Sequence, residues 1–538
     1  MKLLTHPATT ALGLAQLYLL VLTGQLAASD HLVIYHWSGS TPGLFLPTLL
    51  EFFGLWLVLW LLLSQARNAG RLNVAIWSGL VLPLPWVLFK SWRVLTGRSM
   101  PTRLSVFLIG LTVTVFALVV VCWKPRFAPV FEKARGMIAT GLGFAALIAL
   151  FTLGQLLWLG WKARDLNTPL PLHQRQVAAT PAKTRIIWIL FDELSYQQVY
   201  EQRLPGLDLP AFDRLASGAT LFTQTVPAGN MTERVVPSLF TGLPVDSIQV
   251  SSDGHRLSLH DPALRTWVRF DPQDTVFEDA LNAGYSTAIA GWYNPYCRIM
   301  PQVLDQCFWT FDTVHFAGMS PSRTVAENLV AFVRRKFAAA RSFFSQIRKV
   351  PLYEPREARL HQMDYTRIYA AGDNLLEDRS ADFVFLHMPV PHPGGIYDRT
   401  TGSFATTHSS YIDNLALADK YLAHVRAVLE QNGAWDSSTV IVMGDHSWRT
   451  HWLWKPLPSW TREEQIASHG GQFDDRPAYI VKLPYQQEPA RIDLPFEAIH
   501  TRALLDALVQ NRIRSPGELS AWASNCRESD LPQAIAAR

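Results

Sequence analysis

Cysteine, charged residues and net charge are all scarce in this chain of 538 residues. Four cysteines are too few for a disulfide-rich secreted scaffold. The 48 basic residues barely exceed the 44 acidic ones, so bulk charge gives no indication of nucleic-acid binding. Charged residues make up 17% of the chain and hydrophobic residues 49%, with 19 tryptophans, a residue that concentrates at membrane interfaces. This composition favours a membrane protein with a large polar domain.

The hydrophobic residues gather in long runs in the first third of the chain. A bilayer is crossed by about 20 apolar residues, and several runs approach that length. A buried core helix is the alternative for any one run, but a succession of such runs favours membrane spans. The predicted spans are residues 8–28, 44–64, 72–89, 104–123 and 137–161.

The orientation of these spans is not decided by charge, because basic residues divide equally between the two sides. The first run could also be a cleaved signal peptide, since Lys2 precedes it and Ala27 and Ala28 end it. Five spans from an inside start, or four after a cleaved signal, both place the C-terminal part outside. We therefore expect a multi-pass protein of the inner (plasma) membrane with a periplasmic, extracytoplasmic domain.

The remainder of the chain has the pattern of an α/β domain. Residues 1–165 form the predicted membrane domain, 166–184 a linker rich in Pro, Thr, Gln and Ala, and 185–538 the polar domain. Short β-branched runs alternate with helical patterns, which favours a mostly parallel sheet covered by helices on both faces. The predicted strands are residues 186–191, 285–290, 383–386, 439–443 and 478–481.

Carboxylates and histidines follow several of these strands. In such sheets the catalytic residues lie just past the carboxyl ends of the strands. Together these side chains make a nitrogen and oxygen ligand set that suits zinc or manganese. They are Asp192, Glu193, His387, His392, Asp445, His446 and His469.

A segment after the first strand resembles the alkaline phosphatase superfamily. Residues 210–222, PAFDRLASGATLF, are similar to the segment P-x-x-D-R-L-A-x-x-G-x-x-F of families in that superfamily, with the glycine one position earlier, and a Thr241-Gly242 pair comes later. The resemblance is to the sulfatase-like and membrane phosphotransferase branches, whose nucleophile stands nine residues before a Thr-Gly pair at a helix start. It implies a sulfatase-like fold over residues 185–484 and a nucleophile at Thr232.

The residue at the nucleophile position separates the branches. Sulfatases need a Cys or Ser that is converted to formylglycine within C-x-P-x-R, whereas this chain has Thr232 with Pro237 five residues on. That arrangement resembles phosphoethanolamine transferases. Those enzymes and lipoteichoic acid synthases also have five membrane spans before the catalytic domain, the number predicted for this chain. The Asp192-Glu193 pair is closer to the sulfatase form, which leaves the transferred group open.

The resemblance and the strand-end positions together define an expected site. A threonine hydroxyl needs a base or a metal to act as a nucleophile, and no histidine adjoins Thr232 in sequence. We expect one ion on Asp192, Asp445, His446 and the Thr232 oxygen, and a second, substrate-recruited ion on His392 and His469. The cofactor is one or two divalent ions, zinc before manganese, magnesium or calcium. His387 is expected to contact phosphate or to protonate a reacting group, and Glu193 to be a helix-start carboxylate in preference to a ligand.

Three further segments have two interpretations each. The aromatic loop with His451, Trp452 and Trp454 could bind substrate by stacking on sugar or entering the membrane interface, or could pack on the domain. Cys297 and Cys307 could form a disulfide or remain free thiols. Residues 330–349 have an amphipathic, basic pattern, typical of a helix on anionic lipid or of one packed on the domain.

The leading hypothesis is a membrane-anchored, metal-dependent transferase. It would move a phospho-head group, phosphoethanolamine or phosphoglycerol, from a phospholipid donor to a glycan or lipid acceptor through a phosphothreonine at position 232. The first alternative is a phosphodiesterase or sulfatase-like hydrolase of the same fold. The second is an inactive membrane scaffold, which an intact ligand set argues against.

Overall fold

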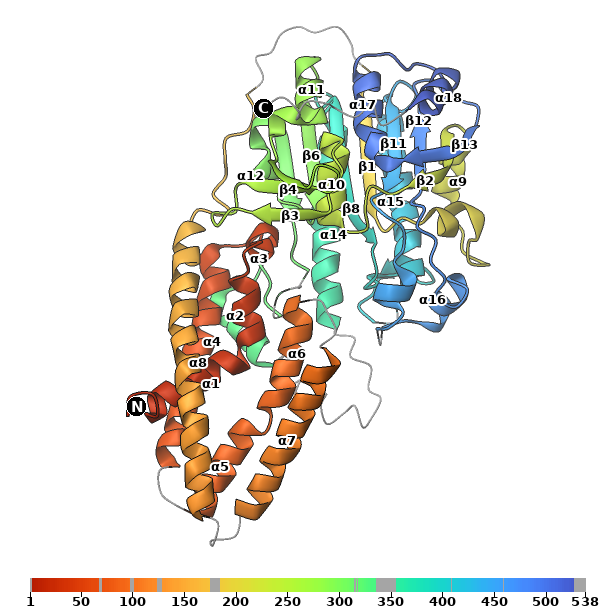
Figure 1. Ribbon diagram of the computed structural model, residues 1–538. Helices are drawn as coiled ribbons and strands as arrows, with labels where there is room; N and C mark the ends of the chain where they lie inside the picture. The colour runs from red at the N-terminus through yellow and green to blue at the C-terminus, as the bar shows by residue number, and fades with distance from the viewer. Residues whose placement is uncertain are drawn as a thin grey trace. The chain divides into compact units, whose positions relative to one another are not determined.

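A computed structural model shows two compact units in the chain (Figure 1). It describes residues 2–66, 70–96, 101–122, 128–174, 184–313, 316, 318–334, 355–407, 409–457 and 459–526. The first unit is formed by Met1–Leu166 with His315–Arg341, and the second by Asn167–Val314 with Ser342–Arg538. The predicted polar domain, 185–538, is therefore interrupted by a segment that belongs to the N-terminal unit.

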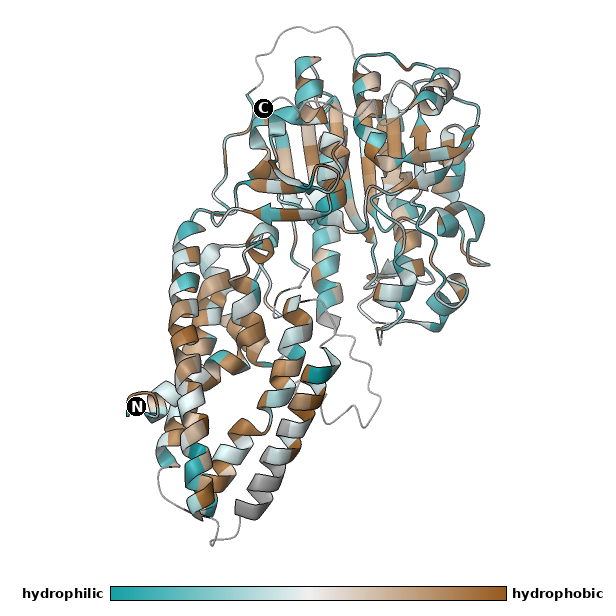
Figure 2. Cartoon of the chain, viewed as in Figure 1, coloured by the Kyte–Doolittle hydropathy of each residue, from teal (hydrophilic) through white to brown (hydrophobic). Residues whose placement is uncertain are grey.

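The first unit consists of apolar helices, and Figure 2 shows hydrophobic residues along most of their length. Three helical stretches are long and apolar enough to cross a membrane: α4 (Thr41–Gln65), Arg71–Thr96 and α8 (Ala128–Lys162). A fourth is possible if α1 (Pro7–Tyr18) and α2 (Leu20–Leu26), bent by 70° at their junction, form one span. The chain thus has the helices of a membrane protein.

The described residues support three or four spans in place of the five predicted. The first predicted run is broken by the bend between α1 and α2. The third lies in the helices α5 (Arg71–Val81) and α6 (Leu84–Thr96), which are separated next to Pro83. α7 (Thr102–Cys122), in the fourth predicted run, is 21 residues long, and its apolar stretch among the described residues is Thr102–Thr114.

The later segment of the first unit adds to its hydrophobic core. Phe316, Met319 and Phe332 are buried together with residues of α1, α4 and α8. Asn328 fixes this segment, because its amide nitrogen donates to the carbonyl oxygens of Ser320 and Gly43. Most of the predicted amphipathic stretch, residues 335–349, lies outside the described residues.

The second unit is built on an eight-stranded sheet with the order β13-β2-β12-β11-β1-β8-β6-β7. Only β12 pairs antiparallel to its neighbours, so the sheet is mostly parallel as predicted. All five predicted strands occur in it. The strands are β1 (Ile186–Asp192), β2 (Thr220–Val226), β6 (Thr287–Trp292), β7 (Gln306–Thr310), β8 (Phe383–Pro391), β11 (Thr439–Gly444), β12 (Tyr479–Lys482) and β13 (Ala490–Glu497).

Helices cover both faces of this sheet, and alternate residues of β1 face the two layers. Ile187 and Ile189 pack with the helices α9 (Pro210–Ala216), α14 (Pro355–Glu377) and α15 (Tyr411–Gln431). Trp188 faces the other way, where its ring contacts Phe240. That layer holds α10 (Thr232–Thr241), α11 (Val276–Asn282) and α17 (Thr501–Val509). The fully buried central strands hold the carboxyl ends of β1 and β11 in fixed positions.

Smaller elements complete the second unit. A three-stranded antiparallel sheet comprises β3 (Ser247–Val250), β4 (Leu257–Asp261) and β5 (Thr266–Arg269). A disulfide joins Cys297 of α12 (Tyr296–Ile299) to Cys307 of β7, which resolves the two interpretations of this pair. Two short helical turns follow β11, η5 (Thr450–Trp454) and α16 (Arg462–Ala467).

Candidate metal and nucleophile site

Two carboxylates lie side by side at the ends of parallel strands. Asp192 is the last residue of β1, where the pairing with β8 shifts register, and Asp445 directly follows β11. Gly444 permits this arrangement, since a Cβ there would lie 2.6 Å from the carbonyl oxygen of Leu194. The peptide nitrogens of Glu193 and His446 donate to Asp445 Oδ1 over 2.9 and 2.7 Å. The Asp445 carboxylate is thereby held in one orientation.

Thr232 brings a hydroxyl to both carboxylates. It is the first residue of α10 and is buried. Its Oγ1 lies 2.9 Å from Asp445 Oδ2 and 3.2 Å from Asp192 Oδ2, so it can donate its proton to either. At this position the positive end of the helix dipole favours negative charge on or near the hydroxyl oxygen.

His446 completes the cluster. Its Nε2 lies 3.2 Å from Asp445 Oδ2, and its Nδ1 lies 3.1 Å from the carbonyl oxygen of Ser447. Burial and, to a smaller extent, the nearby Arg449 cation lower the pKa of His446 to about 3, although Glu193 acts in the opposite direction. The imidazole is therefore neutral at physiological pH, the form in which histidine binds a metal.

The cluster holds more negative charge than its surroundings stabilise. Burial raises the pKa of Asp192 well above its ordinary value, and the charges of Asp445 and Glu193 raise it further. Burial likewise raises the pKa of Asp445, although the hydrogen bond from the Glu193 nitrogen opposes this. Two facing carboxylates in a buried site are stabilised by a cation.

The donor set fits a divalent metal ion. Single ligand atoms of Asp192, Asp445 and His446 lie within 4.8 Å of one another. Asp192 Oδ1 and His446 Nε2 are buried and have no hydrogen-bonding partner in the described part of the chain. Two carboxylates, an imidazole and a hydroxyl form a mixed oxygen and nitrogen set, which suits zinc or manganese in particular.

Glu193 does not begin a helix, contrary to the prediction, and instead forms a buried ion pair. Its backbone is left-handed, with φ of 65°, and this turn directs the carboxylate toward Arg449. Arg449 Nε donates to Glu193 Oε1 over 2.8 Å, and its Nη2 contacts the same oxygen. Trp454 Nε1 lies 3.0 and 2.9 Å from the two carboxylate oxygens. Sequence reasoning missed Arg449, and only its position three residues after His446 could have indicated it.

The two histidines of β8 and its following loop differ in their surroundings. His387 is buried within the strand, and its Nδ1 lies 2.7 Å from the Tyr296 hydroxyl. Burial lowers the pKa of His387 to about 4, an effect that Asp445 partly offsets. His392 packs edge to face against Trp292 and Trp454, and a nitrogen of its ring lies within 4.8 Å of ligand atoms of Asp192 and Glu193.

His469 is not part of either carboxylate and histidine cluster. It is exposed, adopts a left-handed φ of 49° and lies just past the end of α16. The two groups found among the described residues, Asp192 with Asp445 and His446, and Asp192 with Glu193 and His392, do not include it. The prediction of His469 as a ligand came from its position shortly before β12 and from the resemblance, and the structure places it at an exposed turn after α16.

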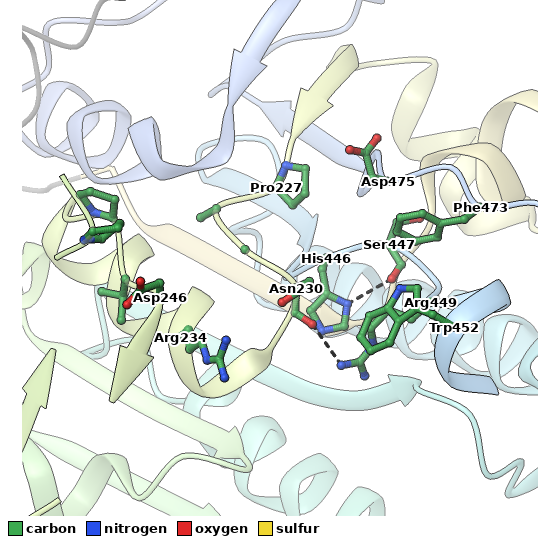
Figure 3. Close-up of a pocket in the computed structure, with 15 residues that line it drawn as sticks. Pro227, Asn230, Arg234, Asp246, His446, Ser447, Arg449, Trp452, Phe473 and Asp475 are labelled. Atoms are coloured by element: carbon green, nitrogen blue, oxygen red, sulfur yellow. Dashed lines mark hydrogen bonds between the residues drawn. The ribbon is translucent and has the colours of Figure 1, made fainter. Parts of the chain in front are cut away.

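A pocket of about 490 Å³ opens beside His446 (Figure 3). One wall is the loop from Pro227 to Asn230 that leads to Thr232, and Arg234 of α10 also faces the pocket. We call residues 450–457 and 459–475 the outer segment. Its exposed Trp452 and Phe473 form an aromatic wall, and the His451 ring contacts that of Phe473 at a tilt. Trp454 instead turns inward to Glu193. The pocket thus extends from His446 and Arg449 to an aromatic rim.

This fold and site define the class of protein: a metal-dependent enzyme of the alkaline phosphatase superfamily, with an α/β domain that carries acid and histidine ligands at its strand ends. The particular family follows from the sequence comparison. The Sulfatase family model matches residues 184–485, more than half of the chain, and the chain belongs to that family. The predicted superfamily and fold are confirmed. No curated protein matches the chain.

Several solved structures resemble the chain remotely. Phosphonate monoester hydrolase of Agrobacterium radiobacter is 14% identical, with 61% of this chain and 74% of that chain covered and a TM-score of 0.36. A protein in the alkaline phosphatase superfamily from Vibrio parahaemolyticus is 14% identical, with 65% and 74% covered and a TM-score of 0.35. Murine ectonucleotide pyrophosphatase / phosphodiesterase 5 is 9% identical, with 63% and 99% covered and a TM-score of 0.35.

Proposed function

We propose that this protein is a membrane-anchored, metal-dependent transferase that moves a phospho-head group from a phospholipid to a cell-envelope glycan or lipid. The observation that carries the proposal is Thr232, whose hydroxyl lies 2.9 and 3.2 Å from two buried carboxylates at a helix start. Sulfatases require a residue that can be oxidised to formylglycine, and threonine cannot be. The apolar helices of the first unit support an enzyme that acts at a membrane.

The first half of the reaction transfers the head group to the enzyme. A bond forms between Thr232 Oγ1 and the donor phosphorus, while the bond from phosphorus to the diacylglycerol oxygen breaks. The threonine proton moves to Asp192 or Asp445, since each lies within hydrogen-bonding distance, and the departing diacylglycerol oxygen takes up a proton. When bound to Asp192, Asp445, His446 and Thr232, the divalent ion would lower the pKa of the hydroxyl and stabilise charge on the phosphoryl oxygens.

The second half transfers the group to an acceptor. A glycan or lipid hydroxyl forms a bond to phosphorus, the Thr232 oxygen leaves, and the threonine regains a proton. The aromatic rim formed by Trp452 and Phe473 suits the apolar face of a sugar ring. Arg234, half-exposed on the pocket wall, is placed to attract a phosphoryl oxygen. The disulfide between Cys297 and Cys307 supports an oxidising, extracytoplasmic compartment.

Hydrolysis is the second candidate, and membership of the sulfatase family favours it. Water would then take the place of the acceptor in the second half of the reaction, and the first half would remain the same. The pocket is large enough to admit an acceptor next to His446, which favours transfer.

The proposal is tested by measuring diacylglycerol release from vesicles of phosphatidylethanolamine and phosphatidylglycerol. The full chain should release diacylglycerol, and the Thr232→Ala variant should not. Adding candidate glycans should raise the rate of a transferase and attach the head group to the glycan. Release at an unchanged rate, with the free head group as the product, would establish a hydrolase. Full release by Thr232→Ala would refute both.

A further inference from the structure

Two acid-containing dipeptides follow neighbouring parallel strands, but their second residues have different environments. After β11, His446 leaves its buried Nε2 without a hydrogen-bonding partner among the described residues. After β1, Glu193 would offer a second ligand group together with Asp192 and His392, whose ligand atoms lie within 4.8 Å of one another. The geometry alone therefore offers room for two ions that share Asp192.

The carboxylate of Glu193 is already occupied. Its Oε1 accepts from Arg449 Nε over 2.8 Å and contacts Arg449 Nη2, and its Oε2 lies 3.3 Å from the Arg449 peptide nitrogen. The Trp454 indole nitrogen approaches both oxygens at 3.0 and 2.9 Å. An ionised carboxylate has about four lone-pair sites, and these contacts use them.

The charges of the buried side chains also favour a single ion. Asp192, Glu193 and Asp445 are buried at this point together with one guanidinium, that of Arg449. A fourth buried carboxylate nearby, that of Glu233, lies 3.9 Å from the half-exposed Arg234. One divalent ion balances the remaining negative charge. A second ion would leave an excess of positive charge in a buried site, which is unfavourable.

Arg449 also contacts the two residues that precede the proposed nucleophile. Its Nη1 donates to the Asn230 carbonyl oxygen over 3.1 Å and lies 3.4 Å from Met231 Sδ, as the dashed line to Asn230 in Figure 3 indicates. Asn230 and Met231 directly precede Thr232. One buried side chain thus connects the turn after β1, the loop after β11 and the start of α10.

We propose that Arg449 is a positioning residue that takes the place of a second cation: it removes Glu193 from the ligand set, fixes the loop before Thr232 and leaves a site for a single divalent ion. It concerns the group of Asp192, Glu193 and His392, and not the substrate-recruited ion predicted on His392 and His469. It rests on the proposed function only through the assignment of the first ion, because ion stoichiometry is measured without substrate.

The test is the number of zinc or manganese ions per chain, measured by elemental analysis and titration calorimetry on the full-length protein in detergent. The native chain should bind one ion. Arg449→Ala should bind a second ion through the freed Glu193, and the double variant Arg449→Ala with Glu193→Gln should return to one. Arg476→Ala is the matched control, since this arginine pairs with Asp474 and Glu201 and should leave the stoichiometry at one.

Turnover gives a second measurement. Arg449→Lys retains the charge but not the fork that joins Glu193 to Asn230, so kcat should fall about 10-fold with KM nearly unchanged, and Arg449→Ala should lose about 100-fold. Two ions per native chain would overturn the proposal, and so would unchanged kcat in Arg449→Ala. The native stoichiometry decides the matter even if the variants fail to fold. A Thr232 adduct that forms in a two-ion protein would refute this inference and leave the proposed function intact.

Discussion

The buried strand-end cluster, which we call the inner wall, meets the pocket through His446, and the outer segment lines it through Trp452 and Phe473. The two differ in how their side chains are held. Asp192, Thr232, Asp445 and His446 are each buried and fixed by contacts from two or more elements. In the outer segment, Trp452 is 42% exposed. Under the proposed function the two would divide the work: the inner wall would perform chemistry that requires a fixed geometry, and the outer segment would select and position the substrate.

The largest effect should come from the hydroxyl of the inner wall. Replacing Thr232 with Ala removes the proposed nucleophile, and kcat for diacylglycerol release should fall by about 10³-fold or more. Thr232→Ser retains a hydroxyl and should keep measurable turnover, which makes it the matched control. Equal loss in both variants would indicate a structural role for Thr232.

Metal binding should distinguish the two regions next. His446→Ala removes a ligand from the inner wall, and the dissociation constant for zinc should rise by about 100-fold. His469→Ala in the outer segment should leave that constant unchanged, because this exposed histidine belongs to neither cluster. Titration calorimetry on both variants measures the contrast. Weaker binding in His469→Ala would restore the ligand role predicted from the sequence.

Stability should depend on pH through the buried histidine of β8. The folded pKa of His387 is about 4 because of burial, whereas the unfolded value is near 6.5, so the unfolded chain holds more protons between these values. The free energy of unfolding should therefore fall as the pH falls, with a loss of about 2 kcal/mol from this residue between pH 7 and pH 5. His387→Gln should remove that part of the slope in chemical denaturation followed by tryptophan fluorescence.

The smallest effect should come from the aromatic rim. Trp452→Ala removes an exposed stacking surface, so KM for the acceptor should rise about 5-fold while kcat stays nearly constant. Trp454→Ala is the informative comparison. Trp454 donates to Glu193, so its replacement should lower kcat. Steady-state kinetics with a glycan acceptor separates the two. A fall in kcat alone for Trp452→Ala would place it in the inner wall.

The sequence predicted the residues of the inner wall. From the outer segment it named His451, Trp452 and Trp454 but not their contacts, and the reason for this difference is physical. Asp192, Asp445 and His446 follow hydrophobic strands, and the parallel sheet brings strand ends together whatever the intervening loops do. Thr232 was found through a resemblance carried by residues around it. The surroundings of His469 and Glu193 depend on local turns, with left-handed φ at both, which no periodic pattern reveals.

The same distinction applies to the fold. The sheet and its flanking helices follow from alternating patterns over long segments, and all five predicted strands are present. The bend between α1 and α2 and the segment that joins the first unit from residues 316–334 depend on tertiary packing, such as that of Phe332. Arg449 has no pattern of its own, since its importance arises from contacts with Glu193 and Asn230, which are distant in sequence.

The most direct test of the central claim is the mass of the peptide that contains Thr232 after the full chain is incubated with phosphatidylethanolamine and phosphatidylglycerol vesicles and quenched in acid. The account predicts an added phosphoethanolamine or phosphoglycerol group on Thr232, absent from Thr232→Ala, and the mass would identify the transferred group. An unmodified Thr232 peptide from protein that is releasing diacylglycerol, or an adduct on another residue, would contradict it.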